Sequence, residues 1–203
     1  MNIKQLLITT SVIAMAITAS AQELRLSAGY NGSQVQEAGR DGWLGKGGYQ
    51  FGADLLLGHQ LFLRTGAHLL VRNLNYSYVR ADENGLPETT PDDFNYTSRS
   101  LRVPAQVGLY LLDPEDRPGF NVYAVGGPSL VYTLSTELDA NELEVQTKDA
   151  QVYLGFGAGA TLGFLFVEGG YDVALARSVE TRLTDPKFNY YYLMGGVRLR
   201  LAR

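Results

Sequence analysis

Apolar residues recur at every second position in short runs along most of this chain. A clear case extends from Tyr49 to Leu57, where apolar residues alternate with Gln, Gly and Asp, and only Leu56 breaks the pattern. Successive side chains of a strand point to opposite faces, so each run predicts a strand with one apolar face and one small or polar face. Helical spacing fits these runs less well.

Eight such runs predict eight strands. We expect them at 23–33, 48–58, 61–78, 97–112, 120–134, 150–163, 165–176 and 190–201. The connections alternate between short (58–60, 113–119 and 163–164) and long (34–47, 80–96, 135–149 and 177–189). Bacterial outer-membrane barrels alternate in this way, with short periplasmic turns and longer external loops. The predicted fold is all-β, an eight-stranded antiparallel up-and-down transmembrane β-barrel.

The first residues have the pattern of a secretory leader. Lys4 supplies a positive charge, an apolar stretch follows, and Ala19-Ser20-Ala21 has the small-x-small form of a cleavage site. The apolar stretch is shorter than the ~20 residues that a membrane helix needs. We therefore expect a signal peptide over 1–21, cleaved after Ala21, and one barrel domain over 22–203, located in the outer membrane.

The first short turn predicts a strand register. Apolar faces stay together across this turn if Leu57 pairs with Leu61, because a shift of one residue would move every side chain to the other face. That register places Asp54 opposite Arg64. We expect the two charges to form a cross-strand ion pair inside the barrel.

Alternation alone does not show which face is inside, since a soluble lipocalin-like barrel turns its apolar face inward. Three features favour the opposite arrangement. The lysines after the leader, Lys46, Lys148 and Lys187, all fall in predicted loops. The charges on the polar face are of mixed sign, so they can compensate one another. The polar face is also rich in glycines that suit a crowded interior: Gly52, Gly66, Gly108, Gly155, Gly157 and Gly159.

Aromatic residues cluster near the predicted strand ends. Those beside the long loops are Tyr30, Tyr76, Tyr78, Tyr96, Tyr132, Tyr153, Tyr190, Tyr191 and Tyr192. Those beside the short turns are Tyr110, Phe120, Tyr123 and Phe164. We interpret them as two aromatic belts at the membrane interfaces, flanking an apolar band that faces lipid.

Several segments resemble a known family. The strand 100–110 (SLRVPAQVGLY), the strand 121–129 (NVYAVGGPS) and the hairpin segments 155–159 (GFGAG) and 167–171 (VEGGY) are similar to PorT-like outer-membrane β-barrel proteins of the Bacteroidetes type. The resemblance implies a cell-envelope barrel with a role in secretion. Two features depart from the family pattern: Gly170 replaces a frequent basic residue, and the chain lacks a terminal aromatic residue.

The chemistry-bearing residues predict a structural interior network rather than an active site. We expect its members to be Asp54, Arg64, His68, Arg72, Arg102, Gln106, Glu168, Asp172 and Arg198. Buried charges need partners, and charge compensation accounts for this set. We predict no catalytic, cofactor-binding or metal-binding residue. A lipid-modifying barrel enzyme using His68 is the alternative, because catalytic triads need not be adjacent in sequence.

The composition of the chain excludes some classes of partner and of active site. The net charge of −4 argues against nucleic acid, and the absence of cysteine excludes cysteine enzymes and thiolate metal sites. A small eight-stranded barrel is filled by its own side chains, so no wide pore is expected. The predicted function is a monomeric, non-enzymatic scaffold or interaction protein. Its expected partners are outer-membrane lipid and, through the long loops, other envelope or secretion proteins.

Overall fold

The computed structural model describes residues 23–35, 43–78, 92–112, 114, 119–138, 146–147, 150–175, 179–180 and 188–201. The predicted signal peptide and most of each long connection lie outside these ranges. Over the described ranges, the structure contains no helix with the length and hydropathy that crossing a membrane requires.

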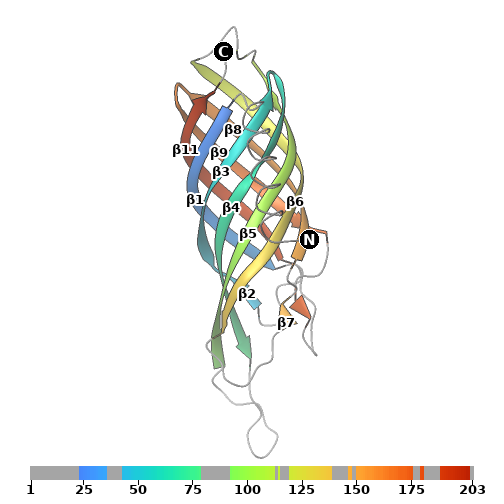
Figure 1. Ribbon diagram of the computed structural model, residues 1–203. Coiled ribbons are helices and arrows are strands. Elements are labelled where there is room, and N and C mark those ends of the chain that lie inside the picture. The colour runs from blue at the N-terminus through green and yellow to red at the C-terminus, as the bar shows by residue number, and fades with distance from the viewer. Residues whose placement is uncertain are drawn as a thin grey trace, which may run out of the picture.

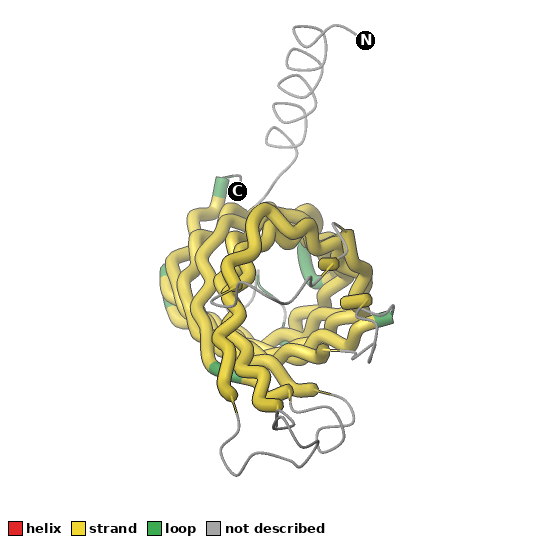
Figure 2. Tube along the Cα trace, turned by 90° about the horizontal axis from the view of Figure 1, so that it is seen from below, coloured by secondary structure: helices red, strands yellow, loops and turns green. Residues whose placement is uncertain are grey.

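Eight long strands form the barrel. They are β1 (Glu23–Val35), β3 (Gly47–Gly58), β4 (Leu61–Tyr78), β5 (Asp92–Tyr110), β6 (Phe120–Leu138), β8 (Ala150–Leu162), β9 (Leu165–Ala174) and β11 (Phe188–Arg200). Each pairs antiparallel with the next one along the chain, and β1 pairs with β11 to close the sheet. Figure 2 shows the closed ring. The predicted eight-stranded antiparallel up-and-down barrel is confirmed.

Three short strands lie where the sequence predicted only loops. β2 (Trp43–Gly45) pairs with the part of β4 beyond the start of β3, and β7 (Gln146–Thr147) pairs with β10 (Val179–Glu180). These segments are too short to show an alternating pattern, so periodicity did not predict them.

The two ends of the barrel differ. The turn end carries the three short connections, with Gly58 and Gly163 at positive φ angles of 122° and 58°. The loop end carries the four long connections, and there β4, β5 and β6 extend past the other strands (Figure 1). The ladder between β4 and β5 continues to the pair Tyr78–Asp92. The predicted start of this strand at residue 97 was therefore five residues late.

The first hairpin has a different register from the predicted one. Leu57 pairs with Leu63 rather than with Leu61, and Asp54 lies opposite Gly66. The shift of two residues keeps every side chain on its predicted face, because the side-chain period of a strand is two. The predicted ion pair is confirmed, since the Arg64 side chain reaches diagonally to Asp54, with Nη2 2.7 Å from Oδ2.

The barrel has an apolar outer face and a polar interior. Large apolar side chains such as Leu63, Val107 and Leu193 are 57%, 48% and 60% exposed. Charged residues on the alternate positions, among them Arg25 and Asp54, are fully buried. This is the opposite of a lipocalin-like barrel, whose apolar face lines the interior.

The aromatic belts were only partly predicted. Tyr30, Tyr49, Tyr132 and Tyr191 lie on the outer face near the loop end, with 45–56% of each side chain exposed. Five other tyrosines point into the interior and are at most 6% exposed: Tyr110, Tyr123, Tyr153, Tyr190 and Tyr192. The prediction was wrong for these five. It considered only how close each tyrosine lies to a strand end, and it ignored whether the side chain alternates to the outer or the inner face.

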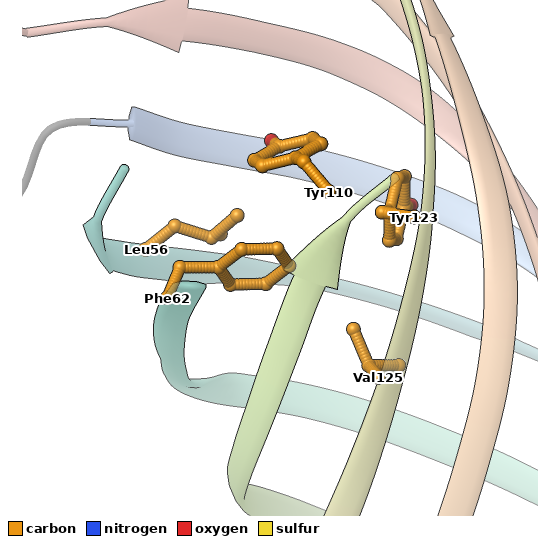
Figure 3. Close-up of a cluster of buried hydrophobic side chains, with 5 residues drawn as sticks. All are labelled: Leu56, Phe62, Tyr110, Tyr123 and Val125. Carbon is orange, nitrogen blue, oxygen red and sulfur yellow. The ribbon is translucent and has the colours of Figure 1, made fainter. Parts of the chain in front are cut away.

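A small apolar cluster fills the interior at the turn end. Figure 3 shows its five members converging from β3, β4, β5 and β6: Leu56, Phe62, Tyr110, Tyr123 and Val125. The rings of Phe62 and Tyr110 are 4.9 Å apart. Leu56, the residue that broke the alternation in the sequence, thus belongs to a packed interior group that closes this end of the barrel.

Glycines make room for the interior rings. A Cβ atom on Gly108 would lie 2.1 Å from the Phe62 ring, and one on Gly159 would lie 2.4 Å from the Tyr123 ring. Both distances are far below van der Waals contact. The glycine-rich polar face is therefore needed for the aromatic side chains of neighbouring strands.

Candidate functional site

The interior contains a central cluster of Asp54, Arg64, His68 and Glu168. Arg64 bridges the two carboxylates, with Nη2 2.7 Å from Asp54 Oδ2 and Nη1 2.7 Å from Glu168 Oε1. His68 Nε2 lies 2.8 Å from Asp54 Oδ1. The cluster joins β3 and β4 to β9 on the other side of the barrel, so it ties opposite walls together.

Glu168 also accepts hydrogen bonds from two tyrosines. Tyr123 donates its hydroxyl at 2.8 Å, and Tyr192 donates at 3.0 Å. With Arg64, three side chains from three other strands thus satisfy one carboxylate that is only 1% exposed. This saturation lowers the cost of burying a charge.

A turn-end cluster consists of Glu23, Arg25, Tyr110 and Arg198. Arg25 Nε lies 2.6 Å from Glu23 Oε1, and its Nη2 donates to the Tyr110 hydroxyl at 2.7 Å. Arg198 Nη1 lies 3.4 Å from the other carboxylate oxygen of Glu23. The cluster connects β1 with β11, the two strands that close the barrel.

Apart from these two clusters, Arg102 and Asp172 form another interior ion pair, nearer the loop end. Nη2 of Arg102 lies 2.8 Å from Oδ1 of Asp172. The Arg102 guanidinium carbon is 5.3 Å from the centre of the Tyr192 ring. A Cβ atom on Gly155 would lie 2.1 Å from Asp172 Oδ1, so this glycine leaves the space that the carboxylate occupies.

The structure buries all nine residues that the sequence analysis proposed for an interior network, at 5% exposure or less. Asp54, Arg64, His68 and Glu168 share the central cluster, and Arg102 pairs with Asp172. Arg198 pairs with Glu23, and it is linked to the central cluster through Arg25, whose Nη1 lies 4.0 Å from Glu168 Oε2. Arg72 interacts with Asp172 at longer range, and neither amide atom of Gln106 has a hydrogen-bond partner among the described residues.

The sequence analysis placed Arg25 among the charges of the interior face but did not assign it to the network, and it missed Glu23 and the interior tyrosines as members of these clusters. A usable signal was present in the alternation. Glu23 shares its face with Arg25, and Tyr110 follows Arg102 and Gln106 at even spacing, which places it on the polar face.

The histidine dyad is enclosed. His68 and Asp54 are both 0% exposed, and Asp54 is also neutralised by Arg64. Within the described ranges, no group of three His, Asp or Glu side chains is placed to hold a metal ion. The arrangement compensates charge and links opposite walls, and it offers no open face to a substrate.

Comparisons with known proteins bear on the fold. No protein-family model and no curated protein matches the sequence. Among solved structures, the outer membrane protein OprG from Pseudomonas aeruginosa is similar, with a TM-score of 0.53 and 8% identity over 89% of this chain and 97% of that one. The two proteins share a fold. This degree of identity shows nothing beyond the fold, and the PorT-like resemblance stays a prediction.

Two further solved structures align over similar lengths. Neisserial surface protein A gives a TM-score of 0.49 and 13% identity, covering 88% of this chain and 96% of that one. Ail of Yersinia pestis, determined in complex with a heparin analogue, gives a TM-score of 0.48 and 14% identity, covering 87% and 98%.

Proposed function

We propose that this chain is an outer-membrane β-barrel that serves as a non-enzymatic scaffold or interaction protein of the cell envelope. The observation that carries the proposal is a barrel with an apolar outer face and a buried central cluster in which Arg64 pairs with both Asp54 and Glu168. A closed barrel satisfies all backbone hydrogen bonds between its strands, and only such barrels and helices can span hydrocarbon. The predicted signal peptide over 1–21 supports export.

The distribution of apolar and polar side chains on the outer face supports a border for the lipid-facing band. At the loop end of β4, β5 and β6, the last apolar ladder is Leu69, Leu101 and Tyr132. Beyond it, most outward side chains are polar, although Val71 and Leu134 are apolar. Thr97 donates to Asn73 at 3.0 Å, and Lys46 donates to Asn95 at 2.8 Å. The projecting ends of these strands therefore suit water outside the membrane.

The filled interior supports a scaffold rather than a wide pore. Ion pairs cross the lumen at its centre, and the apolar cluster occupies the turn end. The loops and the projecting strands then remain as the surface for partners, since a rigid barrel commonly carries function in its loops. The PorT-like resemblance of 100–110 and 121–129 supports a secretion-associated role.

Single-cysteine labelling on intact cells tests location and topology together, because the native chain has no cysteine. A membrane-impermeant maleimide should label Thr136→Cys at the loop end directly. It should label His59→Cys at the turn end only after the outer membrane is permeabilised, and the control Leu63→Cys only after detergent extraction. Direct labelling of Leu63→Cys would refute the membrane assignment, and the reverse order for the other two would invert the topology.

A photo-crosslinking amino acid tests the scaffold role. Placed at Asn95 or Thr136, it should capture a specific envelope protein in cells, whereas the same group at Leu63 should capture lipid. A scaffold role is wrong if both loop-end positions capture nothing while the barrel is folded and in the outer membrane.

A further inference from the structure

Arg72 differs from the other interior arginines. Arg25, Arg64, Arg102 and Arg198 each lie within ion-pair distance of a carboxylate. Arg72 is only 5% exposed, its Nε has no hydrogen-bond partner, and no carboxylate of the described residues lies within 4.0 Å of it. A buried guanidinium without a counter-charge is costly, so this position calls for an explanation.

The Arg72 guanidinium is held by its face. Its central carbon lies 3.6 Å from the centre of the Tyr190 ring and 5.6 Å from that of Tyr153. Stacking of this kind uses the flat face of the guanidinium, so the N–H groups of its edge donate in the plane. Tyr153 interacts with this edge, and Nε has no hydrogen-bond partner among the described residues. The edge of Arg72 is thus oriented for a planar or tetrahedral group of oxygens.

Two further buried polar side chains lie beside this position without partners. Asn31 is 1% exposed, and neither atom of its amide has a hydrogen-bond partner. It pairs across the ladder with Gly48, and a Cβ on Gly48 would lie 2.8 Å from its Oδ1. The Asn31 side chain therefore extends over Gly48 toward β4. Tyr49 pairs with Val71, and the strands are antiparallel, so Gly48, which precedes Tyr49, lies beside Arg72, which follows Val71.

Ser33 is the third buried polar residue near the Arg72 guanidinium. Its hydroxyl is buried without a partner, and Ser33 pairs with Tyr190, the residue under the Arg72 guanidinium. Asp172 also pairs with Tyr190, but Arg102 already engages its carboxylate at 2.8 Å. The loop end of the interior thus gathers one cation and two polar groups that can donate.

The charge balance of the interior agrees with this geometry. The buried ionisable side chains include five arginines but only four carboxylates, Glu23, Asp54, Glu168 and Asp172. Each carboxylate is paired with an arginine other than Arg72. Arg72 is therefore the buried arginine of the described interior that has no carboxylate of its own within ion-pair distance, and Asp172, the carboxylate that interacts with it at longer range, is already paired with Arg102.

We propose that the loop end of the lumen binds a small oxyanion, a carboxylate or phosphate group, between Arg72, Asn31 and Ser33. The Arg72 edge and the Asn31 amide donate to the oxygens, and the Tyr190 ring holds the guanidinium in place. This site goes beyond the proposed scaffold function and depends only on the barrel interior, so either can fail without the other. The occupant is a free anionic solute that enters from the loop end.

Titration of the purified full-length barrel in detergent tests the site. The probes are acetate and inorganic phosphate, followed by calorimetry and by the side-chain Nε–H signals of the arginines in NMR. Saturable binding should shift the Arg72 signal, and Arg72→Gln should weaken binding at least ten-fold. Arg99→Gln removes the same charge from an exposed outer position that pairs with Glu137, and it should leave binding unchanged.

Two further variants keep the test decisive if Arg72→Gln does not fold. Arg72→Lys keeps the charge but removes the planar fork, and Asn31→Ala removes one donor, so each should weaken binding several-fold. The proposal is overturned if the folded native barrel shows no saturable shift, or if Arg99→Gln weakens binding as much as Arg72→Gln. It is also overturned if binding appears only after the long loops are cut by protease, since an acidic loop of the chain would then fill the site.

Discussion

At the scale of single residues, the interior ion pairs of the described residues join different strands, except for the Glu23–Arg25 pair, which lies within β1. Arg64 on β4 holds Asp54 on β3 and Glu168 on β9, and no interior pair of this kind is open to water. A buried ion pair adds little net stability compared with a well-packed apolar pair, but removal of one partner leaves a buried charge behind. The cost of a substitution therefore depends on what remains.

Asp54→Ala should reveal this asymmetry. It leaves Arg64 with one carboxylate instead of two and removes the partner of His68, so we expect a loss of about 3–5 kcal/mol in the free energy of unfolding. Urea unfolding in detergent micelles, followed by the heat-dependent shift in gel mobility, measures the loss.

Glu137→Ala is the control, because it breaks the exposed pair with Arg99 on the outer face. Screening by water limits its cost to about 0–1 kcal/mol. Equal losses for the two variants would show that the central cluster contributes no more than a surface ion pair.

Residue faces were predictable from the sequence, but side-chain partners were not. Alternation correctly placed all nine predicted polar residues inside. It could not show that Arg198 reaches Glu23 on the first strand, because that contact exists only after the barrel closes. Nor could it show that the Arg72 guanidinium stacks on tyrosine rings instead of pairing with a carboxylate of the described residues. The contacts of a long interior side chain depend on which strands lie opposite it across the lumen, and alternation does not contain that information.

At the scale of strands and hairpins, close packing between neighbouring strands depends on pairs of a ring and a glycine. Phe62 on β4 lies over Gly108 on β5, and Tyr123 on β6 lies over Gly159 on β8. The same glycines would weaken a strand by their flexibility if no ring covered them. Strand bounds followed from the alternation, whereas the register of the first hairpin depended on turn geometry that the pattern does not contain.

Gly108→Ala should therefore destabilise the barrel. Its Cβ would lie 2.1 Å from the Phe62 ring, which must move within the packed turn-end cluster. Overpacking of this kind costs about 1–3 kcal/mol in the free energy of unfolding.

Gly126→Ala is the matched control on the outer face. The nearest atom to its added Cβ would be 3.7 Å away, so no ring or backbone has to move. Its effect should be small or slightly stabilising, because alanine restricts the unfolded chain. A loss at Gly126 as large as that at Gly108 would contradict a role for the ring contacts.

At the scale of the whole molecule, the outer surface changes from mostly apolar to mostly polar along the barrel axis, toward the loop end. Large exposed apolar side chains lie on each of the eight barrel strands, and polar outward side chains such as Asn73, Thr97 and Arg99 gather on the ends of β4, β5 and β6. Figure 1 shows that these strand ends project past the other strands. The sequence predicted the apolar face as a whole. It did not predict this border, although the predicted strands 61–78 and 97–112 already include Asn73, Thr97 and Arg99, because the strands were predicted from alternation alone and not from where the outward positions become polar.

Charged substitutions at two heights test the proposed membrane band. Ala158 lies on the exposed outer face within β8, and Ala158→Arg should cost about 2–4 kcal/mol in folding into lipid bilayers. Thr97→Arg lies beyond the last apolar ladder and should cost about 0–1 kcal/mol. The measurement is reversible folding into vesicles, and similar costs at both heights would argue against a lipid band.

The seam between β1 and β11 has a consequence for how the protein is made. The pairing runs from Glu23–Arg200 to Val35–Phe188, so the first and last barrel strands meet along thirteen residue pairs. The charges of Arg64 and Glu168 become neighbours only when that seam forms, since they lie 104 residues apart in the chain. Folding that depends on such distant contacts is slow. With the proposed membrane location, a chain inserted before its last strand is present would expose unpaired charges to lipid, so the complete chain has to be delivered before insertion.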